Sequence, residues 1–149
     1  MGMDPFAKIQ IGNTGVSVPR LGLGTAPLSG MVLGDGLIDV TAHDEAVKII
    51  DRAQELGISY VDTAPLYGNG RAEARLGKSR YATADRDSFV ISTKIGRVLD
   101  PIAGGMSAED DPDGIGDLNS VNSWTREDVH RSIEESLKRL NMDSIEIIY

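Results

Sequence analysis

One stretch, GISYVDTAPLYGNG at residues 57–70, decides the fold and raises the question of function. It starts as a short apolar run and ends in a loop of proline, glycine and asparagine. Asp62 stands at the end of the apolar run, and Tyr67 follows within the loop. A loop that only connected two elements would need neither side chain. The stretch therefore predicts a buried strand whose end carries chemically active groups.

Similar strands recur along the chain. Four segments are short, apolar and rich in β-branched or aromatic residues, namely residues 21–25, 58–62, 89–94 and 144–149. Nearer the N-terminus, residues 8–11 and 16–18 flank a Gly/Asn turn at residues 12–15, which predicts a β-hairpin.

Helical patterns separate the four strands. Residues 44–56 have apolar residues at helical spacing and end at Gly57, a typical helix-terminating glycine. Residues 71–78 predict a short helix whose apolar contacts are Ala72, Leu76 and the nearby Tyr81. Thr125 and Asp128 resemble a capping box, and a stripe follows them: Val129, Ile133, Leu137 and Leu140. The charged residues of this last helix are expected on a mostly solvated face: Arg131, Glu134, Glu135, Lys138 and Arg139.

Strands that alternate with helices predict a parallel sheet with right-handed crossovers. Two architectures fit this order. One is an open, doubly wound sheet, and the other is an arc of a (β/α)₈ barrel.

Composition limits the class of protein. The 149 residues fit one domain or part of a larger one, and 40% apolar with 26% charged residues is typical of a globular chain. The net charge of −8 argues against nucleic acid as the main partner. No apolar run approaches the roughly 20 residues that span a bilayer, and no secretory signal is present, so a cytoplasmic protein without a membrane partner is expected. The absence of cysteine is consistent with a reducing compartment.

Residues 1–7 are set aside as a leader or expression-derived segment, and residues 8–149 are taken as the domain.

An acidic segment between residues 96 and 123 stands apart. Residues 100–123 carry six carboxylates and no Lys or Arg. The pattern lacks the spacing of a calcium-binding EF-hand loop, so no metal site is predicted. Loops of this length are usually functional or disordered, and a mobile, solvated lid or a partly disordered loop is the expectation.

Chemically active residues gather where the strands end. Asp62 ends the strand at 58–62, Tyr67 lies in the loop after it, and Lys94 ends the strand at 89–94. Neighbouring parallel strands lie about 5 Å apart, so these side chains can meet. A phenol titrates near 10, and a nearby ammonium stabilises its ionised form, which makes it a proton donor suited to carbonyl reduction by hydride. A Lys–Asp pair at strand ends can equally be a structural ion pair, so both interpretations stay open.

The glycine-rich segment at residues 22–27 does not fit a Rossmann dinucleotide fingerprint. Pro27 occupies the third glycine position, and no helix start follows. A dinucleotide would have to bind by another route, which favours the barrel.

Taken together, these motifs resemble the aldo-keto reductase family. The similar segments are LGLGT at 21–25, YVDTAPLYG at 60–68, ISTK at 91–94 and SIEESLKRL at 132–140. Within the family, the APLYG variant resembles the branch of D-threo-aldose 1-dehydrogenase, L-fucose dehydrogenase and pyridoxal 4-dehydrogenase.

The resemblance implies a (β/α)₈ TIM barrel, of which this chain supplies an N-terminal hairpin that closes the barrel bottom and about four βα units, a half barrel. It implies an NAD- or NADP-dependent oxidoreductase acting on an aldose or small aldehyde. Three members of a catalytic tetrad match: Tyr67 as general acid/base, with Lys94 and Asp62 tuning it. Gly24 and Thr25 join these three residues on the nicotinamide side, and a substrate pocket would include Ala26 and Trp124. For Trp124, packing over the start of the following helix is an equal alternative.

The fourth tetrad member in the family is a histidine just after the fourth strand, beyond Tyr149. His43 and His130 lie elsewhere and are expected at the surface. The 149 residues alone are therefore expected to be inactive. A half barrel leaves apolar surface and sheet edges uncovered, so the chain is expected either to belong to a longer enzyme or to self-associate. The alternative function is a non-catalytic half barrel that binds a partner.

Overall fold

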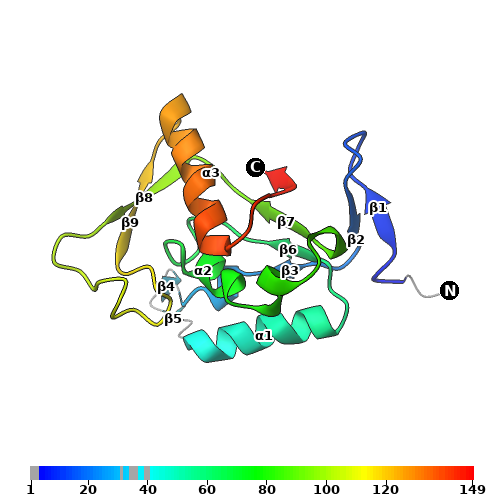
Figure 1. Ribbon diagram of the computed structural model, residues 1–149, viewed down its shortest axis with the longest axis horizontal. Helices are drawn as coiled ribbons and strands as arrows, with labels where there is room; N and C mark the ends of the chain where they lie inside the picture. Colours follow the sequence, from blue (N-terminus) through cyan, green and yellow to red (C-terminus); the bar gives the residue numbers. More distant parts are fainter. Residues whose placement is uncertain (1–3, 31, 34–36, 39–40) are drawn as a thin grey trace.

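A four-stranded parallel sheet forms the centre of the computed structural model, which describes residues 4–30, 32–33, 37–38 and 41–149 (Figure 1). The strands are β3 (Leu23–Gly24), β6 (Tyr60–Asp62), β7 (Val90–Thr93) and β10 (Ile147–Ile148). They lie in the order β10-β7-β6-β3, and every neighbouring pair is parallel. All four predicted strands are confirmed, each shorter than its apolar segment.

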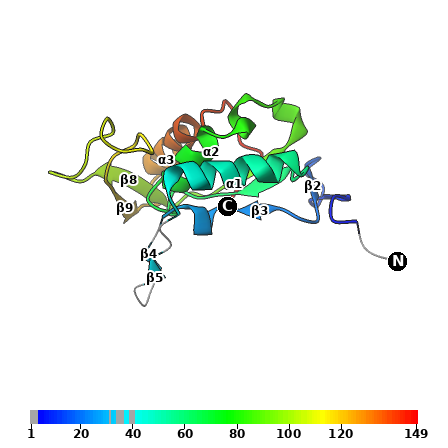
Figure 2. The same ribbon diagram turned by 90° about the horizontal axis from the view of Figure 1, so that it is seen from below.

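Three helices cover one face of this sheet. They are α1 (His43–Glu55), α2 (Arg71–Gly77) and α3 (Arg126–Leu140). Figure 2 shows all three α-helices on the same side of the strands. A doubly wound sheet has helices on both faces, so the arrangement is an arc of a (β/α)₈ barrel.

Local signals set the helix ends. Gly57 has a φ of 85°, and its N–H bonds back to the carbonyl of Gln54 as α1 ends. Such a left-handed residue terminates a helix at little cost only when it is glycine. At the start of α3, the Thr125 side chain accepts a hydrogen bond from the N–H of Asp128 at 3.1 Å, which confirms the predicted cap.

The core lies between the sheet and the helices. Val61 and Ile91 from the two central strands are fully buried. The side chains packed with them come from every helix and from the short 3₁₀ turn Arg80–Thr83: Ala46, Ile50, Leu76, Tyr81 and Leu140, with Leu28 and Phe89 alongside. A second 3₁₀ turn, Arg86–Ser88, leads into β7.

Hairpins flank the two ends of the sheet (Figure 1). At the N-terminal end, β1 (Lys8–Gln10) pairs antiparallel with β2 (Ser17–Pro19), as predicted. Further along the chain, β4 (Val32–Leu33) pairs with β5 (Leu37–Ile38), which the sequence analysis did not anticipate. Of the leader expected at residues 1–7, residues 1–3 lie outside the described residues, and the Pro5 carbonyl accepts the Leu21 N–H at 3.0 Å.

The acidic segment is folded, so the expectation of disorder was wrong for its two strands and for Asp111 and Asp113, while residues 101–110 are exposed. Strands β8 (Arg97–Pro101) and β9 (Leu118–Asn122) form an antiparallel hairpin. Asp111 and Asp113 in its connection are buried, 7% and 3% exposed. Residues 100–123 contain no Lys or Arg, but arginines of α2 pair with these buried carboxylates, and this pairing across the fold could not be read from the local composition.

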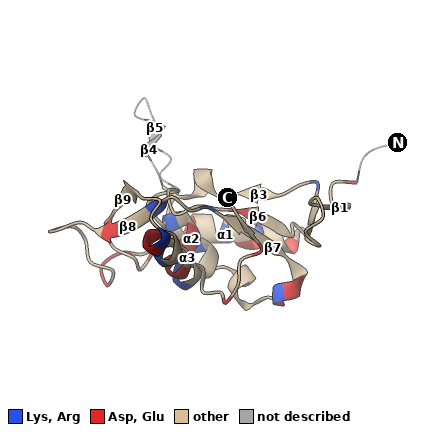
Figure 3. Cartoon of the chain, turned by 90° about the horizontal axis from the view of Figure 1, so that it is seen from above, with Lys and Arg blue, Asp and Glu red and all other residues tan. Residues whose placement is uncertain are grey.

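Two other expectations need correction. His43 is only partly exposed, because its Nδ1 lies 2.6 Å from Oδ1 of Asp113. Arg139 is not on the solvated face of α3: its side chain is 9% exposed, and its Nε lies 2.8 Å from Oε2 of the fully buried Glu73. His130 is exposed, as expected. Figure 3 shows the acidic and basic residues of α3 interleaved along the helix.

Candidate active site

Asp62 and Lys94 meet at the C-terminal edge of the sheet. Asp62 is the last residue of β6, and Lys94 directly follows the neighbouring strand β7. Because Asp62 is in register with Ser92, Lys94 extends just beyond the carboxylate. Its Nζ lies 3.0 Å from both Asp62 carboxylate oxygens and 2.9 Å from the carbonyl oxygen of Thr63. These three acceptors match the three hydrogens of an ammonium group.

Tyr67 completes this cluster from the loop between β6 and α2. Its backbone N–H bonds to the Ala64 carbonyl, and its own carbonyl accepts from Ala72 at the start of α2, which holds the loop in place. The Lys94 Nζ lies 4.9 Å from the centroid of the Tyr67 ring, within the range of a cation–π contact. The structure therefore brings all three predicted catalytic residues together.

The electrostatics keep the lysine charged. Burial alone would lower the pKa of Lys94, but the hydrogen bonds and charge of Asp62, with the neighbouring Tyr67 phenol, outweigh it and raise that pKa above its ordinary value. Lys94 is therefore an ammonium ion at neutral pH, fixed between a carboxylate and a phenol.

Comparison with known proteins agrees with the fold. Residues 20–149 match the aldo/keto reductase family. The chain belongs to this family. It is 37% identical to D-threo-aldose 1-dehydrogenase of a Pseudomonas species, in a match that covers 91% of this chain and 40% of the relative. It is 32% identical to pyridoxal 4-dehydrogenase of Microbacterium luteolum, in a match that covers 100% of this chain and 44% of the relative. The holo form of an aldo-keto reductase from Bacillus halodurans superposes with a TM-score of 0.66 at 26% identity, over 94% of this chain and 38% of that structure. The chain thus spans less than half the length of these relatives.

Within this aldo-keto reductase chain, the segment after β3 contacts Asp62 from the side opposite Lys94. Thr25 is fully buried, and both its N–H and its hydroxyl donate to the carbonyl oxygen of Asp62 at 3.0 Å. Gly24 is exposed, and a side-chain Cβ placed there would have no neighbour within 4 Å. Ala26 opens the 3₁₀ turn Ala26–Leu28 and is partly buried. Thr25 thus anchors the end of β6, while Gly24 leaves open space beside it.

Trp124 lies at the base of the acidic hairpin. Its side chain covers Gly96, where an added Cβ would lie 2.4 Å from the indole. Trp124 is 72% exposed, so its indole offers an apolar surface over Gly96, which follows Lys94 by two residues.

Two further residues, Ser92 and Tyr60, belong to the cluster and were not among the predicted site residues. Ser92 Oγ lies 2.7 Å from Oδ1 of Asp62, and the Tyr60 hydroxyl lies 3.1 Å from Ser92 Oγ. Strand alternation was the available signal: Tyr60 precedes Asp62 by two positions, as Ser92 precedes Lys94, so all four share the face opposite the helices.

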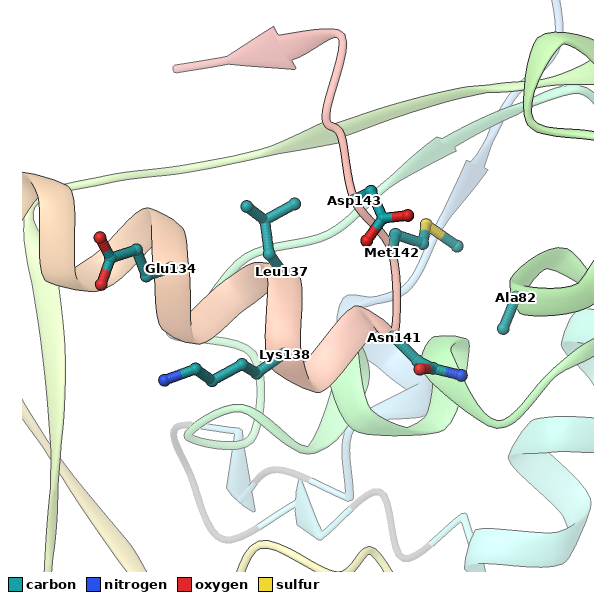
Figure 4. A pocket seen from close by; sticks show the side chains of 7 residues that line it. All are labelled: Ala82, Glu134, Leu137, Lys138, Asn141, Met142 and Asp143. Atoms are coloured by element: carbon teal, nitrogen blue, oxygen red, sulfur yellow. The ribbon is translucent and has the colours of Figure 1, made fainter.

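A hollow of about 760 Å³ lies away from this site, on the helix side, between the C-terminal half of α3 and the turn that contains Ala82 (Figure 4). Its lining mixes charged and apolar side chains, among them Glu134, Lys138, Leu137 and Met142, and includes none of Asp62, Tyr67 and Lys94. In the described ranges, no helix is long and apolar enough to cross a membrane, and no group of three potential metal ligands occurs.

Proposed function

We propose that this chain carries the proton-transfer residues of an NAD- or NADP-dependent oxidoreductase that interconverts the carbonyl and alcohol forms of an aldose or small aldehyde. The observation that supports it is the position of Lys94, whose ammonium contacts the Asp62 carboxylate on one side and faces the Tyr67 ring on the other. The similarity to D-threo-aldose 1-dehydrogenase and pyridoxal 4-dehydrogenase supports the substrate class.

Each residue has a separate part in the chemistry. Tyr67 donates its hydroxyl proton to the carbonyl oxygen as negative charge develops there, and takes a proton back in the reverse direction. Lys94 stabilises the phenolate that remains, and Asp62 holds the ammonium in place and balances its charge. A bound nicotinamide cofactor supplies or accepts the hydride.

The residues around the cluster fit such a cofactor. The space beside Gly24 is open at the same strand edge as Asp62 and Lys94, so a flat ring can approach the backbone there. Gly24 and Thr25 on β3, with the three catalytic residues, are the proposed contacts on the nicotinamide side. Ala26 and the exposed indole of Trp124 are the proposed substrate contacts, since sugars and small aldehydes pack well on apolar surfaces.

The test is the full-length protein with a panel of aldoses and aldehydes, each with NAD and NADP. Tyr67→Phe removes only the hydroxyl. We expect turnover to fall by about 10²–10⁴-fold, the usual contribution of general acid–base catalysis, with cofactor binding retained. Tyr81→Phe is the matched control, because its hydroxyl bonds to the Ile58 carbonyl at 2.5 Å, away from the cluster. Undiminished turnover in Tyr67→Phe would refute the mechanism.

A second candidate is a half barrel that binds a partner or a second copy of itself. The observation that favours it is an apolar hollow of about 380 Å³ on α1, beside the exposed side chains of Ile49 and Leu56. Light scattering on the 149-residue chain would show a dimer or larger species, and cofactor fluorescence would show no binding. A compact monomer that binds the cofactor would exclude this candidate.

A further inference from the structure

A chain of hydrogen bonds runs behind the catalytic cluster, from Tyr60 through Ser92 to Asp62. The Tyr60 hydroxyl and Ser92 Oγ lie 3.1 Å apart, and Ser92 Oγ lies 2.7 Å from Oδ1 of Asp62. Ser92 is fully buried in the middle of the sheet. Its hydroxyl is therefore shielded from solvent.

The direction of each bond follows from the groups themselves. An ionised carboxylate only accepts, so Ser92 donates its single hydrogen to Asp62. With that hydrogen used, Ser92 can only accept from Tyr60. Burial raises the pKa of Tyr60 and outweighs the hydrogen bond to Ser92, so the phenol keeps the proton that it donates.

These bonds fix the carboxylate from two sides. Oδ1 of Asp62 accepts from Ser92 and from Lys94, while Oδ2 accepts from Lys94 alone. Among the described contacts, Ser92 is the side chain on β7 that opposes rotation of the partly exposed Asp62 carboxylate away from the Lys94 ammonium. Lys94 would then lose the geometry that directs its charge to Tyr67.

We propose that Ser92, supported by Tyr60, is a positioning residue that holds the Asp62 carboxylate in its two-bond contact with Lys94. Its importance for turnover rests on the function proposed above, but the contact itself can be measured without turnover.

The same strand offers a matched control. Thr93 faces the opposite side of β7, where its hydroxyl donates to Oε1 of Glu73 at 2.6 Å, and it is as buried as Ser92. Thr93→Val therefore removes a buried hydroxyl bonded to a carboxylate, as Ser92→Ala does, but on the helix side of the sheet.

The direct measurement is heteronuclear NMR of the Lys94 side chain, which follows the exchange of its ammonium hydrogens with water at neutral pH. We take the loss of one hydrogen bond to a charged group to change the exchange rate about tenfold, which corresponds to 1.4 kcal/mol. We expect exchange to be about tenfold faster in Ser92→Ala, unchanged in Thr93→Val, and slowed again in Ser92→Thr, which restores the hydroxyl. Unchanged exchange in Ser92→Ala would overturn the proposal.

Turnover gives an independent readout. In the full-length enzyme, Ser92→Ala should lower kcat about tenfold with little change in KM, and Thr93→Val should leave both near their original values. Should Ser92→Ala fail to fold, Tyr60→Phe removes only the outer donor. Faster Lys94 exchange in this variant supports the chain of bonds, and unchanged exchange overturns it.

The two proposals fail in different ways. If the unaltered protein shows no carbonyl reduction but Ser92→Ala speeds Lys94 exchange, the proposed function fails and the positioning role stands. If turnover depends on Tyr67 but Lys94 exchange is indifferent to Ser92, the positioning role fails and the function stands.

Discussion

Arg75 of α2 and Asp113 of the acidic hairpin form a buried, two-bond ion pair. Their Nε and Oδ1 atoms lie 2.8 Å apart and their Nη2 and Oδ2 atoms 3.1 Å apart, with side chains 6% and 3% exposed. The remaining Nη1 of Arg75 donates to the carbonyls of Leu28 and Thr41. One guanidinium thus ties the hairpin connection to the segment after β3 and to the approach to α1.

Asp113→Asn should destabilise the protein strongly, because it leaves the Arg75 charge buried without its counter-ion. Breaking a buried pair in this way costs about 3–5 kcal/mol. Urea unfolding of the two proteins measures the difference. Asp110→Asn is the control from the same loop, since Asp110 is exposed and bonds only to Ser107 among the described contacts. Equal losses in the two variants would contradict the role assigned to the buried pair.

The same pair predicts how stability depends on acid. Burial alone would raise the pKa of Asp113, but the hydrogen bonds and charges of Arg75 and His43 outweigh it and lower that pKa below its ordinary 3.8. A lowered folded-state pKa means that the contribution is fully present above the unfolded value and is lost as pH falls through the folded value. The stability gap between the original protein and Asp113→Asn should be constant from about pH 5 upwards and shrink below pH 3.8. A gap that persists at lower pH would contradict this assignment.

The elements with regular periodicity were predictable from the sequence, and the ion pairs across the fold were not. The strand ends at Asp62 and Lys94 could be placed, because alternation and the parallel order determine which side chains share an edge. The pairing of Arg75 with Asp113 joins residues 38 positions apart. Nothing in the spacing of either residue distinguishes it from a solvated charge, so the acidic segment was interpreted as a lid.

The packing of helix α3 against its neighbours was also not predictable from the sequence pattern of one helix. Its apolar stripe predicted the helix correctly, yet the most buried positions include Ser132 and Ser136 beside Leu140. Small residues permit close approach of another backbone, and at Gly77 of α2 an added Cβ would lie 2.1 Å from the carbonyl oxygen of Arg139. The distance between two packed helices depends on the side chains of both contact surfaces. The hydrophobic periodicity of one helix therefore does not predict it.

Gly77→Ala should therefore destabilise the contact between α2 and α3. The added methyl group meets backbone atoms of Arg139 and Leu140, which cannot move aside as a flexible side chain can. Overpacking of this kind costs about 1–3 kcal/mol. Thermal or urea unfolding measures the loss, with Gly24→Ala at the exposed end of β3 as a control for the loss of a glycine without close neighbours. A stability equal to that of the original protein would show that the helices can separate without cost.

Tyr81 should make the fold sensitive to alkali. Burial raises the pKa of Tyr81 from 10.0 to about 12. A raised folded-state pKa means that the contribution is fully present below pH 10 and is lost as pH rises through about 12. Two units correspond to about 3 kcal/mol. Unfolding measured between pH 10 and 12 should show Tyr81→Phe losing less stability than the original protein over that interval. Parallel pH curves for the two proteins would contradict the assignment.

Gly24→Ala should separate stability from cofactor binding. An added Cβ at Gly24 meets no atom within 4 Å, so the free energy of unfolding should change by only about 0.5 kcal/mol or less. The methyl group would occupy the space beside Asp62 and Lys94 that the nicotinamide ring is proposed to use. Fluorescence titration of the full-length protein should then show cofactor affinity reduced about tenfold, a loss of 1.4 kcal/mol. Equal affinity with equal stability would show that the open space at Gly24 is not where the cofactor approaches, and the cofactor contacts would have to be sought on the other side of Lys94.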